Sequence, residues 1–181
     1  MIDALLREAD HKMDQAVTHA SQEFSTIRTG RANPALLNRI TVDYYGTETP
    51  LQQIAGFTVP EARLLVVQPY DKSAIGDIER AIQESDLGLN PSNDGNVIRL
   101  AFPTLTEERR KELIKVARGL AEDGRVAIRN VRRHAKDSIE SEDVSEDDIH
   151  RAEKTLQEMT DRHVGKLDQL LAVKEEELLE V

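Results

Sequence analysis

Positively charged side chains recur along residues 106–136, and they are the residues of this sequence best suited to bind a ligand. Most lie three, four or seven positions apart, which places them on one face of a helix. Arginine outnumbers lysine in the second half of the run, and a guanidinium group can hold two phosphate oxygens at once. The pattern indicates a ridge that binds a phosphate backbone, formed by Lys111, Lys115, Arg118, Arg125, Arg129, Arg132 and Lys136, with Arg133 and His134 nearby.

The charge of this run contrasts with that of the rest of the chain. The whole sequence carries a net charge of −10, whereas residues 106–136 carry +5 and residues 137–181 carry −10. A second interpretation is therefore open, in which the basic stripe is a solvated face that pairs with acids of a neighbouring helix. Spacing alone does not decide between the two.

No residue pattern indicates catalysis, a metal or a cofactor. Cysteine is absent, which excludes thiol nucleophiles and cysteine metal sites. Asp147 and Asp148 stand at an expected helix start, where they favour the helix dipole, so they are a poor acid/base pair. No phosphate loop of the GxxxxGK[ST] kind occurs. The histidines lack HExxH or HxH spacing and are scattered at His11, His19, His134, His150 and His163. We expect a protein that is not an enzyme.

The sequence also gives no sign of a membrane or an export route. No apolar run approaches the roughly 20 residues that cross a bilayer, and the first residues lack a basic segment followed by an apolar one. The absence of cysteine fits a reducing compartment. We expect a cytoplasmic protein with no membrane partner.

The elements that position the basic stripe follow from hydrophobic periodicity. Apolar residues at helical spacing predict long helices over residues 2–29, after an N-cap at Thr106, and after a second N-cap at Ser145. Period-two alternation between them predicts a hairpin over 40–51 and strands over 54–59, 63–68 and 96–102, with a short helix capped by Ser73. The prediction is an α+β fold, with a three-helix bundle from 1–30 and 105–181 and an inserted α/β domain over 31–104.

Two adjacent connections would join these domains, and a pair of side-by-side crossings makes a natural hinge. Gly30 can end the first helix in a left-handed conformation. Arg28 and Arg31 either contact a ligand or brace the junction. The expected hinge residues are Arg28, Thr29, Gly30, Arg31, Phe102, Pro103 and Thr104.

Five segments, in order along the chain, closely resemble the ribosome recycling factor family. They are residues 27–34 (IRTGRANP), 44–47 (YYGT), 85–91 (SDLGLNP), 105–111 (LTEERRK) and 125–133 (RVAIRNVRR). The likeness covers essentially the whole chain and implies an L-shaped molecule built from a three-helix bundle and an inserted domain. The chain departs from the family pattern between Arg133 and Ser145, where it is shorter by roughly one helical turn.

The resemblance also implies the function. Such a factor binds the post-termination ribosome through large-subunit ribosomal RNA and, with elongation factor G and GTP, promotes separation of the subunits. The GTPase chemistry belongs to the partner, which the resemblance places near the small domain. We expect a monomer, with Tyr44 and Tyr45 packing the small domain. The alternative is a helical protein–protein adaptor that does not bind RNA. Carried over onto this sequence, the RNA-binding residues are Arg129 and Arg132, with Arg133, Arg125 and Arg110 as weaker candidates.

Overall fold

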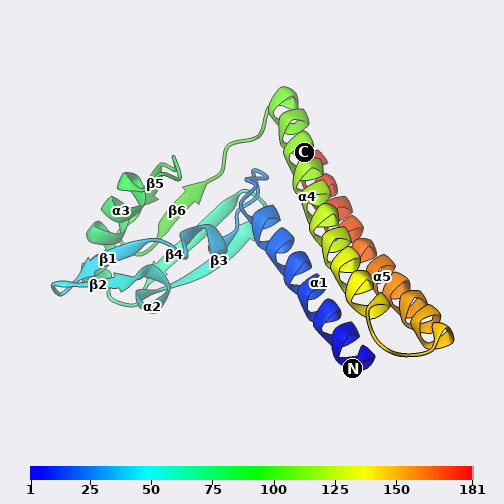
Figure 1. The fold of residues 1–181 in the computed structure, drawn as a ribbon. Coiled ribbons are helices and arrows are strands. Elements are labelled where there is room, and N and C mark those ends of the chain that lie inside the picture. Colours follow the sequence, from blue (N-terminus) through cyan, green and yellow to red (C-terminus); the bar gives the residue numbers. More distant parts are fainter. Residues whose placement is uncertain (181) are drawn as a thin grey trace. The chain divides into compact units, whose positions relative to one another are not determined.

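The computed structural model describes residues 1–180, which form two compact units (Figure 1). One unit joins Met1–Thr29 to the chain from Thr106 onward, and the other is Gly30–Leu105. Long helices make up the first unit and short antiparallel strands dominate the second, so the predicted α+β class is confirmed. Within residues 1–180, no helix is both long enough and apolar enough to cross a bilayer.

Helices α1 (Ile2–Ser25), α4 (Glu107–Glu140) and α5 (Glu146–Leu179) pack side by side, and α4 runs opposite to the other two (Figure 1). Their buried faces repeat at helical spacing, as the apolar pattern predicted. The helices approach one another closely at Gly124, where an added Cβ would lie 2.8 Å from a Leu167 methyl carbon and 3.5 Å from Cβ of Ala20. A side chain at position 124 would therefore collide with Leu167 of α5.

The N-termini of α4 and α5 form as predicted. The Thr106 hydroxyl accepts a hydrogen bond from the backbone N–H of Arg109 at 3.1 Å, and the Ser145 hydroxyl accepts one from that of Asp148 at 3.2 Å. Each hydroxyl satisfies a backbone donor that has no partner inside the helix. Both predicted caps are confirmed, and residues 141–145 form the connection between the helices.

Helix α1 ends earlier than predicted. It stops at Ser25 rather than near residue 29. The hydroxyls of Ser25 and Thr26 donate to the carbonyls of Gln22 and Glu23, and these local bonds compete with continuation of the helix. Gly30 does have a positive φ of 77°, but it lies beyond the helix end and does not cap it.

The second unit contains a hairpin, β1 (Thr41–Tyr44) and β2 (Thr47–Pro50), and a separate four-stranded antiparallel sheet. The strand order of the sheet is β3 (Ala55–Glu61), β4 (Leu64–Pro69), β6 (Ile98–Ala101) and β5 (Pro91–Asn93). Helix α3 (Ile75–Glu84) and the short α2 (Leu51–Ile54) complete the unit together with 3₁₀ turns at Pro34–Leu37 and Lys72–Ala74. Its core is built from apolar side chains such as Leu65, Val67, Ile78, Ile82, Ile98 and Leu100.

Two local predictions in this unit were wrong. Ser73 does not cap the short helix; instead the Asp71 carboxylate accepts from the backbone N–H of Ser73 at 2.9 Å and caps the turn before α3. Tyr44 packs against the core, but Tyr45 is 79% exposed. Tyr45 occupies the hairpin turn at φ 50°, and its hydroxyl donates to Asp71. The turn conformation therefore carries its ring out of the core.

Candidate nucleic-acid interface

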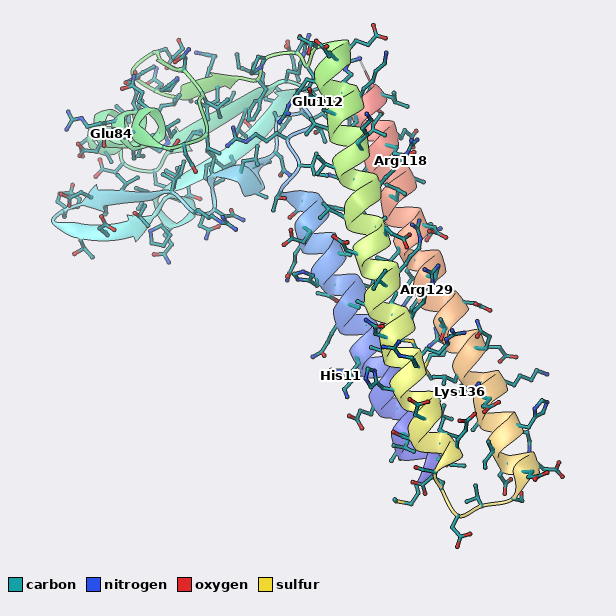
Figure 2. All side chains as sticks on the ribbon, turned by 45° about the horizontal axis from the view of Figure 1, so that its top comes forward. His11, Glu84, Glu112, Arg118, Arg129 and Lys136 are labelled. Atoms are coloured by element: carbon teal, nitrogen blue, oxygen red, sulfur yellow. The ribbon has the colours of Figure 1, made fainter. Side chains whose placement is uncertain are left out.

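Part of the basic stripe lies on the flank of α4 that faces α5. Arg118, Arg125 and Arg132 each donate a hydrogen bond to a side chain of α5. Figure 2 shows Arg118, Arg129 and Lys136 at successive levels along α4. The predicted gathering on one face thus holds for these three arginines, and the partners of the stripe cations that follow Lys115 distinguish two parts.

The first part, named here the proximal pair, consists of Arg118 and Arg125, and acids neutralise it. Arg118 Nε lies 2.7 Å from a Glu175 carboxylate oxygen. Arg125 donates to Asp168 through Nε at 3.1 Å and Nη2 at 2.7 Å, and to Glu122 through Nη1 at 3.1 Å. Only 21% of the Arg125 side chain is exposed, and hydrogen bonding to Asp168 raises the pKa of its guanidinium. The proximal pair therefore joins α4 to α5.

The second part, named here the distal cluster, consists of Arg129, Arg132, Arg133 and Lys136. Arg132 donates to the side-chain oxygen of Gln157 at 2.7 Å, which is a neutral acceptor. All four line one hollow on the surface, together with Asn130, Asp137 and Glu140. Within residues 1–180, no acid of α5 forms an ion pair with any of the four.

The remaining contacts of the distal cluster stay within α4, and they are long. Arg129 lies 3.4 Å from Glu122, Lys136 lies 3.6 Å from Glu140, and Arg133 donates to Asn130 at 3.3 Å. Exposed pairs of this kind contribute little, about 0–1 kcal/mol, so an incoming phosphate can displace them. About half of each side chain is accessible in the Arg129 and Lys136 pairs. The cluster can hold several phosphates of a nucleic-acid backbone.

Arg110 lies apart from the stripe. It stands five helical turns before Ile128 and so shares the core-facing side of α4. Its Nε atom is buried and has no hydrogen-bond partner among the described residues. Of the five residues expected to bind RNA, the structure brings Arg129, Arg132 and Arg133 together at one hollow, places Arg125 among carboxylates and leaves Arg110 on another face.

Several residues of the expected hinge are tied into the second unit. The Phe102 N–H donates to the carbonyl of Arg63 at 2.8 Å, and the Arg63 guanidinium donates to the Thr104 hydroxyl. A Cβ added to Gly30 would lie 3.4 Å from the Pro103 carbonyl oxygen, so these two connecting segments are neighbours. Arg28 and Arg31 each have an interaction partner, and Thr29 is the last residue of the first bundle segment. Phe102 and Thr104 thus belong to the framework of the small domain.

The packing of α1 against α5 creates a polar cluster that the sequence reasoning missed. His163 is fully buried, with Nε2 2.8 Å from an Asp10 oxygen and Nδ1 3.3 Å from an Asp14 oxygen. Arg162 and Lys166 lie 2.7 and 3.4 Å from the same two carboxylates. The hydrogen bond with His163 is the main cause that lowers the pKa of Asp10. Since cationic partners already surround both carboxylates, we interpret the group as an ion cluster that joins the two helices.

A local signal for this cluster was nevertheless present. His163 falls four residues before Leu167 and four after Met159, on the apolar stripe of its helix. A histidine on such a stripe must find polar partners when it is buried. The identity of those partners was not readable, because Asp10 is 153 residues away in the chain.

This chain matches known proteins over its whole length. A family profile described as ribosome recycling factor matches residues 20–179. The ribosome-recycling factors of Acidothermus cellulolyticus and Thermobifida fusca are 57% and 56% identical over 185 aligned positions that cover 100% of each chain. A solution structure of the ribosome recycling factor superposes with a TM-score of 0.81 at 42% identity, covering 99% of this chain and 98% of its own.

A second structure with this fold belongs to a larger assembly. It describes the T. thermophilus ribosome recycling factor and the E. coli elongation factor G bound to the E. coli post-termination complex. The T. thermophilus chain is 46% identical to this one, with a TM-score of 0.68 and coverage of 99% of this chain and 100% of its own. The profile match and the full-length identity together show that this chain belongs to the ribosome recycling factor family.

Proposed function

We propose that this chain recycles ribosomes: it binds the post-termination ribosome and, with elongation factor G and GTP, promotes separation of the subunits. Family membership supports the proposal, as does the relative described with elongation factor G on a post-termination complex. The chain acts by binding and position, as a monomer, while GTP hydrolysis belongs to the elongation factor. The absence of a phosphate-loop motif from the sequence fits this division of labour.

The distal cluster is the proposed contact with large-subunit ribosomal RNA. The observation that carries this assignment is that Arg132 donates to a neutral amide where Arg125 donates to carboxylates. A guanidinium group that no acid neutralises keeps its attraction for phosphate, and its planar donors match phosphate oxygens. Acidic surfaces elsewhere, with a net charge of −10 over residues 137–181, disfavour contact through other faces.

A splitting assay with purified ribosomes tests the proposal. Post-termination ribosomes are mixed with elongation factor G and GTP, and light scattering reports subunit separation with this chain added or omitted. We expect separation only with the chain present, and a strongly reduced rate for Arg132→Ala at limiting concentrations. Separation that proceeds equally without the chain would overturn the proposed function.

Domain movement is the second part of the proposed mechanism. Because the sequence has no cysteine, a designed pair of cysteines that links the bundle to the unit Gly30–Leu105 would form a single defined crosslink. We expect the oxidised protein to bind ribosomes but fail to separate subunits, and the reduced form to regain activity. Splitting at a normal rate by the crosslinked protein would exclude a mechanism that needs a hinge.

The adaptor alternative rests on the proximal pair, because Arg118 and Arg125 do form the interhelical ion pairs that it requires. If the whole stripe served only to join helices, association with ribosomes would not depend on salt. RNA contact predicts that log K falls by about 0.7 to 0.9 per tenfold rise in salt for each phosphate neutralised. A salt titration of ribosome binding therefore separates the two functions.

A further inference from the structure

Arg132 contacts Gln157 at a level where the helix register would predict an ion pair with Asp161. Along α4, Arg118 and Arg125 are seven residues apart, and their partners Glu175 and Asp168 are seven residues apart in the opposite direction on α5. The next step of seven on each helix pairs Arg132 with Asp161. The repeating register therefore predicts a third ion pair at this level.

That ion pair does not form. Arg132 Nη1 donates instead to Gln157 Oε1 at 2.7 Å, and Gln157 Nε2 donates to Asp161 Oδ1 at 2.9 Å. The amide thus accepts from the cation and donates to the anion, and stands between them. Gln157 and Asp161 lie one helical turn apart, so the hydrogen bond between them lies within α5.

We propose that Gln157 is a positioning residue that keeps the Arg132 guanidinium oriented but not neutralised, so that it remains available to RNA phosphate. This inference rests on the proposed function of the distal cluster. It extends that function by naming a neutral residue on a different helix as a determinant of the binding strength of Arg132.

The chemistry of the amide explains both effects. A guanidinium group has five N–H donors, and one hydrogen bond to the amide oxygen leaves four for phosphate oxygens. The Asp161 carboxylate accepts a hydrogen bond from the same amide, so it has a donor other than Arg132. Arg125 shows the contrary case, since donors on all three of its nitrogens are bound to carboxylates of Asp168 and Glu122.

A mutant cycle between Gln157 and Asp161 tests this role. Gln157→Met keeps the length of the side chain and removes its polar atoms, so Arg132 is expected to pair with Asp161 and affinity for purified large ribosomal subunits to fall about two- to fivefold. Asp161→Asn alone is expected to bind no more weakly than wild type. The double variant should bind like Asp161→Asn, because the competing carboxylate has been removed.

Matched controls separate this inference from the function on which it rests. Gln169→Met makes the same exchange at an exposed position of α5 and should leave affinity unchanged. If Arg132→Ala also left affinity unchanged, the proposed RNA site itself would fail. If Arg132→Ala weakens binding while Gln157→Met does not, or if Asp161→Asn fails to restore the Gln157→Met protein, the positioning role is overturned. Thermal unfolding of each variant verifies that the fold is intact.

Discussion

Arg125 and Arg132 lie seven residues apart on one face of α4, yet α5 offers them partners of different charge. Arg125 is bound by Asp168 and Glu122 and is largely covered, whereas Arg132 meets the neutral Gln157. The same spacing in the sequence thus serves two purposes. Near Arg125 the stripe holds two helices together, and near Arg132 it presents cations that no acid of α5 neutralises.

The largest expected effect comes from removing two cations of the distal cluster at once. Arg129→Gln combined with Arg132→Gln should weaken binding to large ribosomal subunits by about 3–6 kcal/mol, since each charged hydrogen bond contributes about 1.5–3 kcal/mol. The slope of log K against log salt should become shallower by about 1.4–1.8 as two phosphate contacts are lost. Filter binding over a range of salt concentrations measures both quantities. An unchanged slope would show that these side chains do not neutralise phosphate.

The second-largest effect concerns the packing of α4 against α5. Gly124→Val should lower the free energy of unfolding by about 1–3 kcal/mol, because the new side chain would overlap the buried Leu167. Gly119→Ala is the matched control, because a Cβ there meets nothing within 4 Å. Alanine is a better helix former than glycine, so this change should raise the free energy of unfolding by at most about 1 kcal/mol. Urea denaturation of the two proteins gives the comparison, and equal changes would contradict the close packing at Gly124.

A smaller effect is expected when the proximal pair is broken. Arg125→Gln should lower the free energy of unfolding by roughly 0.5–1 kcal/mol, the scale of a partly exposed ion pair. Affinity for the large subunit should stay within about threefold of wild type, because the Arg125 guanidinium is already hydrogen-bonded to carboxylates and is not available to phosphate. Denaturation and binding are measured on the same preparation. A loss of affinity without a loss of stability would place Arg125 with the distal cluster.

The smallest effect is a pH dependence at the seam between α1 and α5. The pKa of Asp10 is held below its usual value of 3.8 in the folded protein, so this carboxylate stabilises the fold above that pH. The contribution is lost as pH falls through the lowered folded-state pKa. Because 39% of the side chain is exposed, solvent screening keeps the effect to a few tenths of a kcal/mol. Unfolding measured between pH 6 and about pH 3 should be less pH-dependent for Asp10→Asn than for wild type.

The parts of the fold that could be predicted are those that depend on neighbours in the sequence. Thr106 and Ser145 cap their helices because each hydroxyl needs only a backbone N–H three residues away. The apolar stripes of α1, α4 and α5 likewise follow from periodicity. The end of α1 was predicted too late because Gly30 indicates a helix cap in the sequence. The helix ends earlier, where the hydroxyls of Ser25 and Thr26 donate to backbone carbonyls.

The candidate site was predictable only in part. Periodicity placed the cations on one face, but their partners depend on how α5 packs against α4, as in the close approach of Leu167 to Gly124. Arg110 carries the same charge as Arg129, and only its phase on the helix separates it from the stripe. The difference between Arg125 and Arg132 rests on Asp168 and Gln157, residues of another helix that no local pattern connects to them.

The most direct test of the account compares Arg132→Ala and Arg125→Ala side by side in equilibrium binding to purified large ribosomal subunits at one fixed salt concentration. We expect Arg132→Ala to weaken binding by about 1.5–3 kcal/mol, at least tenfold, while Arg125→Ala stays within about threefold of wild type. Equal losses for the two variants, or a greater loss for Arg125→Ala, would contradict the division of the stripe into a structural part and a binding part.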